Sequence, residues 1–530
     1  QIDWGRVMKV SRRDMLKIGA FSTAAMLVPI ERLGHASLAN QPRLAASLLP
    51  APFTVPFTVP PVIHPFRTDD TTDYYKIYMK PFQAEVLPGI QTPMWGYNGT
   101  CPGPTIQVAQ GRQTIVRHVN NLPAQHPTLA YTPWTSVHLH GSPSQPEYDG
   151  YASDVTNPGQ YKDYVYPNSP TGRTLWYHDH GVGHTAENVQ MGLAAQYHLY
   201  DPLERTLPIP HGAYDVPLIV SDAMFAADGT LLIDNHDGSG MYGDVILVNG
   251  RPWPAMRVAR RKYRFRVLNA CVSRSFQFFL DSGDPVTMIG TDAGLMPVPV
   301  KVKNWRHGMA ERYEIIIDFS KYPVGRRVVL GNNSPKNNIN YPNVDKVMAF
   351  DVVADDFSKA GNSIPSALNP DNPVMALKAS DAVKTRRFDF VRANGQFTIN
   401  GRTWDNVVAS GFTYVEANPN HGDVELWEVR NLSGGWFHPV HIHLVDFKIL
   451  DRNGKPPLPH EQGPKDVVYL GEGETARLLM RFEGRGKYMM HCHNLVHEDH
   501  DMMTQFEVFP TADTFDPLDD PCQDLPEQEL

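Results

Sequence analysis

The sequence lacks three features that would indicate other classes of protein. It has no basic patch, and its net charge of −9 and isoelectric point of about 6.2 give no sign of binding to nucleic acid. No apolar run is long enough to cross a bilayer, which argues against an integral membrane protein. Long helical patterns are few. With 530 residues the chain is too long for one domain and fits about three or four.

Short β-strand patterns are abundant instead. Segments rich in Val, Ile, Tyr and Phe often alternate in polarity, as in YRFRVL (263–268) and YEIIIDF (313–319). These segments are punctuated by 46 prolines and 40 glycines. Because this combination is typical of β-sandwiches, we expect an all-β fold.

An internal repeat indicates how many sandwiches there are. The turn pair Asn-Gly recurs at a spacing of 151 residues, and an alternating strand that ends in another asparagine follows each copy. The three turns are Asn98-Gly99, Asn249-Gly250 and Asn400-Gly401, and the strand-ending residues are Asn121, Asn269 and Asn431. One Asn-Gly pair is a common turn signal. Three copies in the same context predict three repeated domains.

The N-terminus has the pattern of an export signal. The twin-arginine segment SRRDMLK (11–17) precedes the apolar run 18–30, and Ser37-Leu38-Ala39 fits a small-x-small cleavage site. The alternative is an ordinary amphipathic N-terminal helix. We therefore predict a signal peptide over 1–39, recognised by the twin-arginine export machinery. The mature protein is then an exported bacterial protein, periplasmic or secreted.

The four cysteines have different surroundings in the sequence. Cys271 lies in a strand-like segment and is predicted to be a buried free thiol. Cys101 and Cys522 either form a disulfide with each other or remain unpaired. Export permits a disulfide, but cysteine pairing cannot be deduced from sequence. Cys492 belongs to a motif with metal-ligand spacing.

That motif is HCHNLVHEDHDMM (491–503). Cys492, His497 and Met502 match three ligands of a His₂Cys copper site with a weak axial methionine. On an extended strand alternate side chains point to opposite faces, so His491 and His493 face away from Cys492. The motif therefore predicts a second metal centre joined covalently to the first.

Further histidine pairs provide ligands for this second centre. Three more His-x-His pairs occur, namely His138-Leu139-His140, His178-Asp179-His180 and His441-Ile442-His443. Together with His491 and His493 they give eight imidazoles, enough for two three-histidine coppers and one two-histidine copper. His438 supplies the second imidazole of the mononuclear site. A single such pair is expected by chance among 22 histidines, but four pairs beside the Cys/His/Met spacing are not.

The motifs as a group resemble those of a known family. They are HLHGSPSQPEYDG (138–150), RTLWYHDHGVGHTAENVQMG (173–192), WFHPVHIHLVDF (436–447) and MHCHNLVHEDHDMM (490–503). From about residue 80 to 510 the chain resembles the multicopper oxidases. Within that family it is most similar to bilirubin oxidases and bacterial spore-coat laccases.

The resemblance implies three cupredoxin-like Greek-key β-sandwich domains. The first would span 40–205 and the third 386–512, and both would hold copper ligands. The second, at 206–385, has no His-x-His pair and is interpreted as a spacer. Residues 513–530 would form a C-terminal tail.

The resemblance also implies four copper ions with separate ligands. The type 1 copper would be held by His438, Cys492, His497 and Met502. The type 2 copper would be held by His138 and His441. The type 3 pair would be held by His140, His178 and His493 on one ion and by His180, His443 and His491 on the other. Cys492 would also carry electrons between the two sites.

Two carboxylates are candidates to deliver protons to dioxygen, and both match acidic positions of related laccases. Asp149 follows His140 in PEYDG, where plain turn chemistry is the alternative. Glu498 follows His497, where a solvated carboxylate or an orienter of an imidazole is the alternative. Asp179 is interpreted as structural. Trp436 either lines the substrate entrance, tunes the type 1 copper or packs in the core.

The predicted function is a copper-dependent oxidase of the laccase or bilirubin oxidase type. It would oxidise phenolic or other aromatic compounds one electron at a time and reduce dioxygen to water. A cuprous-ion oxidase is the alternative among enzymes, although no dense methionine cluster exists outside the ligand motif. A copper-free binding protein on the same fold and a two-domain nitrite reductase are disfavoured by the complete ligand set. The oligomeric state is not predicted.

Overall fold

The computed structural model describes residues 42–236, 238–356 and 358–510, with the backbone of 523–524. The predicted signal segment 1–39 and Cys522 lie outside the described residues. Strands dominate the chain and the longest described helices have six residues, so the predicted all-β fold is confirmed. The helices are α3 (Thr185–Gln190), α4 (Pro202–Thr206), α5 (Pro373–Ala376), α6 (Trp404–Ala409) and α7 (Leu495–Asp499). Within the described residues, no helix is both long and apolar enough to span a membrane.

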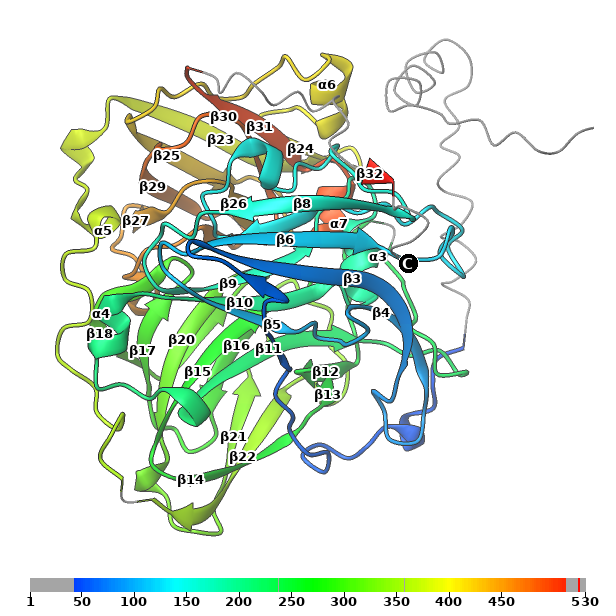
Figure 1. Ribbon diagram of the computed structural model, residues 1–530, viewed down its shortest axis with the longest axis vertical. Coiled ribbons are helices and arrows are strands. Elements are labelled where there is room, and N and C mark those ends of the chain that lie inside the picture. Colours follow the sequence, from blue (N-terminus) through cyan, green and yellow to red (C-terminus); the bar gives the residue numbers. More distant parts are fainter. Residues whose placement is uncertain (1–41, 237, 357, 511–522, 525–530) are drawn as a thin grey trace, which may run out of the picture.

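All strands of the sheets except β32 fall in three consecutive stretches of chain, called here the first part (62–200), the middle part (215–355) and the third part (384–508). In Figure 1 the first part is blue to cyan, the middle part green and the third part yellow to red-orange. Each part contains two sheets. Domain boundaries at 205 and 385 stay a prediction.

The first part has a five-stranded and a six-stranded sheet. The five-stranded order is β1 (Val62–Ile63), β5 (Thr105–Ala109), β10 (Ala194–Tyr200), β9 (Arg173–Asp179) and β7 (Val137–His140). The other order is β2 (Arg67–Thr68), β3 (Thr72–Ala84), β6 (Gln113–Asn120), β8 (Gln160–Tyr166) and β32 (Gln523–Asp524), with β4 (Thr92–Tyr97) on β3. Residues 523–524 therefore pair with β8 at the edge of this sheet.

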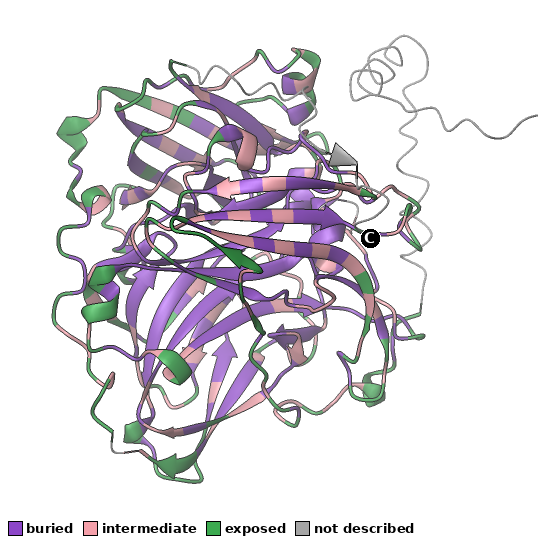
Figure 2. Ribbon diagram, viewed as in Figure 1, coloured by how far each residue is buried: buried purple, intermediate pink, exposed green. Residues whose placement is uncertain are grey.

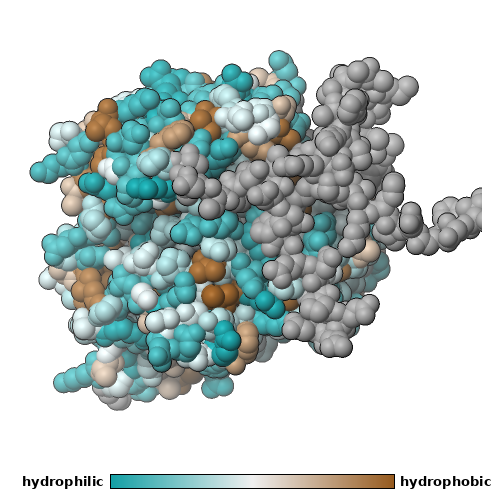
Figure 3. All heavy atoms as spheres, turned by 45° about the horizontal axis from the view of Figure 1, so that its top comes forward, coloured by the Kyte–Doolittle hydropathy of each residue, from teal (hydrophilic) through white to brown (hydrophobic). Residues whose placement is uncertain are grey.

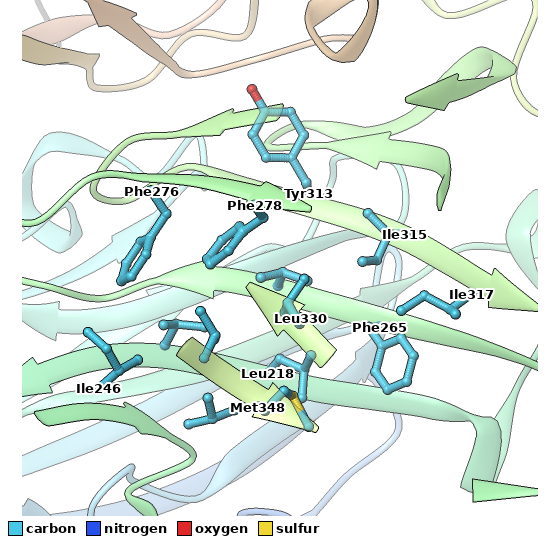
Figure 4. Close-up of a cluster of buried hydrophobic side chains, with 14 of the residues drawn as sticks. Leu218, Ile246, Phe265, Phe276, Phe278, Tyr313, Ile315, Ile317, Leu330 and Met348 are labelled. Carbon is cyan, nitrogen blue, oxygen red and sulfur yellow. The ribbon is translucent and has the colours of Figure 1, made fainter. Parts of the chain in front are cut away.

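The middle part has a seven-stranded and a five-stranded sheet. The larger order is β13 (Arg251–Pro252), β12 (Val245–Val248), β11 (Asp215–Ala223), β15 (Lys262–Asn269), β20 (Arg312–Asp318), β17 (Val286–Thr291) and β18 (Gly294–Val302). The smaller order is β14 (Ala255–Arg260), β22 (Lys346–Asp355), β21 (Arg327–Asn332), β16 (Phe276–Leu280) and β19 (Asn304–His307). Their apolar faces pack together around Phe265, Ile315 and Leu330 (Figure 4).

The third part has a five-stranded and a four-stranded sheet. The first order is β24 (Gln396–Ile399), β23 (Lys384–Ala393), β25 (Val424–Asn431), β29 (Thr475–Arg481) and β27 (Phe447–Arg452). The second is β28 (Val467–Leu470), β26 (His438–Ile442), β30 (Gly486–Cys492) and β31 (Met503–Val508). Figure 2 shows that the strands of all three parts are mostly buried, whereas exposed residues gather at the outer loops. The face in Figure 3 is largely hydrophilic, with hydrophobic side chains in small groups.

The Asn-Gly repeat is a structural repeat. Asn98, Asn249 and Asn400 all have positive φ, as do the glycines that follow them, which is the backbone of a type I′ turn. In each copy the asparagine Oδ1 accepts a hydrogen bond from a strand backbone N–H, at 2.8–2.9 Å. The same local chemistry therefore closes the same hairpin three times.

The second asparagine of the repeat is Asn120 in the first part, so the assignment to Asn121 was wrong by one residue. Asn120 Oδ1 accepts from the N–H two residues on, as Asn269 and Asn431 do, at 2.9–3.1 Å. Its Nδ2 donates to backbone carbonyls on two loops. Asn121 is exposed. The sequence has two adjacent asparagines here and does not show which of them ends the strand. The structure shows that β6 ends at Asn120.

Replacing Asn120 with alanine should destabilise the protein by about 1–3 kcal/mol, because buried backbone groups lose their partner. Calorimetry should show a lower unfolding temperature. The Asn121→Ala variant is the matched control and should unfold close to the wild-type temperature. Equal shifts for the two variants would contradict the role given to Asn120.

Candidate metal centre

The four His-x-His pairs all stand at the ends of strands. β7 ends on the second histidine of its pair, while β9, β26 and β30 end one residue before it. His138 lies opposite His178 in the first part, and His441 lies opposite His491 in the third. All eight side chains are buried. Antiparallel pairing thus brings two pairs together in each of these parts.

The pairs from the first and third parts meet face to face. His138 Nε2 lies 3.4 Å from His441 Nε2, and His180 Nε2 lies 3.1 Å from His491 Nε2. His443 Nε2 is 3.2 Å from His491 Nε2. Two nitrogens bound to one ion at about 2.0–2.1 Å would be roughly 3–3.5 Å apart. These spacings therefore fit imidazoles that share metal ions.

The histidines form three sets whose ligand atoms all lie within 4.8 Å of one another. The sets are His138, His441 and His443; His140, His178 and His493; and His180, His443 and His491. The second and third sets are the two triples that the family resemblance implied. The first contains the predicted pair and adds His443, which belongs to two sets.

The ring nitrogen that points away from the centre is held by the protein in most of these residues. The contacts are His138 Nδ1 with Asp149 O (2.5 Å), His178 Nδ1 with Asp179 O (2.8 Å), His441 Nδ1 with Asp466 O (2.9 Å), His443 Nδ1 with Asp149 Oδ2 (2.7 Å), His140 Nε2 with Asp466 Oδ1 (3.0 Å) and His491 Nδ1 with Glu498 Oε2 (2.8 Å). Such contacts orient metal-ligating imidazoles and set their tautomers.

One set has buried nitrogens that lack a partner. His140 Nδ1, His178 Nε2 and both nitrogens of His493 make no hydrogen bond within the described residues. An unsatisfied buried polar atom costs about 1–3 kcal/mol. Burial also lowers the pKa of these three histidines well below the ordinary value, so the rings are neutral and have lone pairs to offer. This donor set fits a copper ion.

A separate site surrounds Cys492. Its Sγ lies 3.4 Å from His438 Nδ1 and 3.6 Å from His497 Nδ1, and all three residues are buried. His438 Nε2 contacts Ser433 Oγ at 3.0 Å, and His497 Nε2 donates to the Ser239 carbonyl at 3.1 Å. Both imidazoles therefore present Nδ1 to the thiol, which suits a His₂Cys metal site.

Apolar and aromatic side chains enclose this site. Met502 is fully buried in the same hydrophobic cluster as Cys492. Phe397 stacks on His497 with ring centroids 4.1 Å apart. Trp436 is partly exposed, packs against the same hydrophobic cluster and lies 5.5 Å from His497 between ring centroids, with the rings nearly perpendicular.

Asp149 and Glu498 both lie beside the paired histidines. Asp149 is buried, which raises its pKa well above the ordinary value. Glu498 lies 2.8 Å from His491 Nδ1 and 3.5 Å from His180 Nδ1. Burial raises the pKa of Glu498, but interactions with His491 and His180 outweigh it and lower the pKa below the ordinary value. Each carboxylate therefore contacts the histidine sets directly.

Asp179 has a structural environment, as expected. Its carboxylate accepts hydrogen bonds from Ser136 N and Asn188 Nδ2, both at 2.9 Å. Sequence reasoning missed Asp466, which contacts two histidines, and Ser239, which comes from the middle part. Neither stands at a fixed spacing from a histidine motif, so no local signal identified them.

Family models match both ends of the described chain. Two models described as multicopper oxidase match residues 79–203 and 377–512. These segments contain every residue of the histidine sets and of the Cys492 site.

Named relatives agree with the family models. The chain is 42% identical over 454 residues to a bilirubin oxidase from Albifimbria verrucaria, covering 82% of this chain and 76% of that protein. It is 32% identical over 501 residues to a laccase from Bacillus subtilis, covering 84% and 96%. A solved laccase from Pediococcus acidilactici superposes with a TM-score of 0.77 at 28% identity, covering 89% and 96%. McoA multicopper oxidase from Aquifex aeolicus gives 0.74 at 28%, covering 85% and 100%.

Metal-free protein should lose stability as the pH falls below about 6.5. Burial lowers the pKa of His438 to about 3 and is the main cause that lowers the pKa of His180 to about 4. The unfolded chain protonates these rings near pH 6.5, so it binds more protons below that pH. Each ring then removes up to about 1.4 kcal/mol of stability per pH unit until its folded pKa is reached.

Unfolding temperatures of the metal-free protein, measured from about pH 8 to about pH 5, test this expectation. The His438→Gln variant should show a weaker pH dependence than the wild type. His421 is exposed, so His421→Gln is the control and should leave the dependence unchanged. A wild-type unfolding temperature that is constant across this range would refute the account.

Proposed function

The chain belongs to the multicopper oxidase family, and from this premise we propose that it acts as a laccase-like or bilirubin-oxidase-like enzyme. It would oxidise phenolic or other aromatic compounds with dioxygen as the electron acceptor. The observation that carries the proposal is the position of Cys492. Its thiol lies between His438 and His497, while its sequence neighbours His491 and His493 belong to the paired-histidine sets.

Bound copper would supply the one-electron chemistry that connects oxidation of an organic substrate to reduction of dioxygen to water. Four ions are proposed. We assign His438, Cys492, His497 and Met502 to the type 1 ion; His138 and His441 to the type 2 ion; and His140, His178, His493, His180, His443 and His491 to the type 3 pair. The unpartnered nitrogens of His140, His178 and His493 support this assignment.

Cys492 would join the two sites. Only backbone and side-chain bonds separate its sulfur from the imidazoles of His491 and His493. Both neighbours belong to the histidine sets while the thiol faces His438 and His497, so one short covalent path serves both sites. An electron that enters at the Cys492 site has a direct route to the histidine sets.

The substrate would approach past Trp436. His438 and His497 are almost completely buried, so an aromatic substrate cannot stack on either ring. Trp436 is partly exposed and contacts His497, which makes it the bridge between the surface and the site. The guanidinium of Arg392 covers its ring at 4.6 Å.

Glu498 and Asp149 are proposed to deliver protons during dioxygen reduction. Glu498 contacts His180 and His491, and Asp149 contacts His443 and His138. A carboxyl group that exchanges protons beside the reacting site is a suitable general acid. Both carboxylates therefore contact the set of His180, His443 and His491, each at a different histidine.

Export and domain organisation complete the proposal. We propose that residues 1–39 form a twin-arginine signal peptide and that the mature protein is periplasmic or secreted. The domains are proposed to span 40–205, 206–385 and 386–512, followed by a tail at 513–530. The strands of the first, middle and third parts fall inside these ranges, except that β23 begins two residues earlier, at Lys384, and that β32 (Gln523–Asp524) joins a sheet of the first part.

Copper-loaded protein should be blue, contain four coppers per chain and consume dioxygen when given a methoxyphenol. Cys492→Ser should abolish the blue absorption and the oxidation together, because a ligand and the covalent path are both lost. Cys271→Ser is the matched control, since Cys271 is also a buried free cysteine but contacts neither site. It should retain colour, copper and activity.

Wild-type protein with one copper or none, after expression with ample copper, would rule out the proposed function. A second measurement distinguishes the proposed substrates from cuprous ion. Steady-state oxidation rates are measured on one copper-loaded sample for bilirubin, a methoxyphenol, an aminophenol and Cu(I). Much faster oxidation of Cu(I) than of the aromatic compounds would favour a cuprous-ion oxidase.

Glu498→Gln should slow reoxidation by dioxygen about 100-fold or more, since glutamine cannot deliver a proton. Anaerobic bleaching of the blue absorption by substrate should stay near its normal rate. Stopped-flow absorbance measures both half-reactions. Glu425→Gln is the control, because Glu425 is a buried carboxylate of the third part that binds Arg386 and Trp427. Equal slowing of both half-reactions would indicate that Glu498 only supports the structure.

A further inference from the structure

The middle part contains none of the paired histidines, yet one of its arginines approaches them. Arg312 is the first residue of β20 and is fully buried. Tyr313, Ile315 and Ile317 of this strand belong to the hydrophobic core of the middle part (Figure 4). Alternation directs Arg312 to the opposite face of the sheet, toward the first and third parts.

Every N–H of the Arg312 guanidinium is engaged. Nε donates to Thr174 O at 2.9 Å, Nη1 to Ala310 O at 3.0 Å and Nη2 to Asp292 O at 2.9 Å. Nη1 and Nη2 also donate to the two carboxylate oxygens of Asp466, the former at 2.7 Å. A guanidinium has five N–H donors, and this fork uses all of them. The orientation of the Asp466 carboxylate is thereby fixed.

Asp466 connects this arginine to two histidines. Its Oδ1 accepts from His140 Nε2 at 3.0 Å, and its backbone carbonyl accepts from His441 Nδ1 at 2.9 Å. The two imidazoles stack with centroids 3.7 Å apart. One residue therefore holds a histidine of the first part against a histidine of the third.

Asp292 fixes the backbone of Asp466 from the same side. Its Oδ1 accepts from Arg312 N at 2.7 Å, and its Oδ2 accepts from the backbone N–H groups of Asp466 and Val467, both at 3.2 Å. Lys465 Nζ lies 2.9 Å from Oδ2. The start of β28 is thus fastened to the middle part.

Gly141 shows how closely these groups pack. It follows His140 in the HLHG motif and has a φ of +89°. A β-carbon there would lie 2.6 Å from Arg312 Nη2 and 2.8 Å from Asp466 Oδ2. No side chain fits between the arginine–carboxylate pair and the histidine strand, so the pair contacts the strand directly.

We propose that Arg312 and Asp466 are positioning residues for the copper cluster, and that the middle part controls copper occupancy through them. The inference rests on the proposed function. With Nε2 bound to Asp466, His140 presents its unpartnered Nδ1 to the set it shares with His178 and His493. Without the fixed carboxylate, the His140 ring can turn or change tautomer, and this set loses one donor.

The Arg312→Lys variant tests the proposal, because lysine keeps the charge but cannot bind both carboxylate oxygens. Copper-loaded full-length protein is treated with increasing EDTA, and copper content and blue absorption are followed together. The variant should release the cluster copper at roughly 10- to 100-fold lower EDTA than the wild type, while the blue absorption stays unchanged. Arg266→Lys is the control, since Arg266 is equally buried on β15 and binds Asp215, Glu204 and Glu314.

Equal EDTA resistance in the Arg312→Lys and Arg266→Lys variants would overturn the proposal, as would parallel loss of blue absorption and cluster copper. If Arg312→Lys does not fold, Asp466→Asn gives the same test, because its amide has one acceptor oxygen and cannot accept from both Nη1 and Nη2 of Arg312. Loss of cluster copper alone, in either variant, supports the proposal. Wild-type protein without four coppers would instead reject the proposed function.

Discussion

A neutral imidazole offers one donor and one acceptor, and a buried ring needs a partner at both nitrogens. In the histidine sets, the protein supplies the partner of the outward nitrogen, and a metal ion would supply the partner of the inward nitrogen. Carboxylates and carbonyls of Asp149, Asp179 and Asp466 bind the outward nitrogens, so the inward nitrogens are left facing one another across the boundary between the first and third parts. The strand ends and their register place the histidines, and the buried carboxylates orient the rings. The inward nitrogens then define where metal can bind.

Local spacing predicted much of this centre, because the relevant signals are short-range. His491 and Cys492 end strand β30 and His493 follows directly, so alternation along the extended chain separates the thiol from the two imidazoles. The division into triples built on His140 and on His180 came from the family resemblance and not from spacing, and it coincides with two sets that the structure brings together. The Asn-Gly turns were equally accessible, since both residues need positive φ and few other pairs tolerate it.

The residues that sequence reasoning missed act over long distances in the chain. Asp466 and Arg312 are separated by 154 residues, and they meet only in the folded chain, where the start of β20 lies beside the residue that precedes β28. Ser239 reaches His497 from 258 residues away, through a loop that carries no motif. The middle part was therefore interpreted as a spacer, although it contacts both the Cys492 site and the histidine sets. The error at Asn121 has another origin, since neighbouring asparagines differ only in where the strand ends.

The pairing of β7 with β9 restricts how this chain can change during evolution. His138 and His178 are directly opposite, and so are His441 and His491 on β26 and β30. Insertion of one residue within any of these strands would turn its histidines to the other face of the sheet. Length variation among descendants of this sequence is thus confined to the connecting loops, and the spacing inside each His-x-His strand should persist even where the loops around the sites diverge beyond recognition.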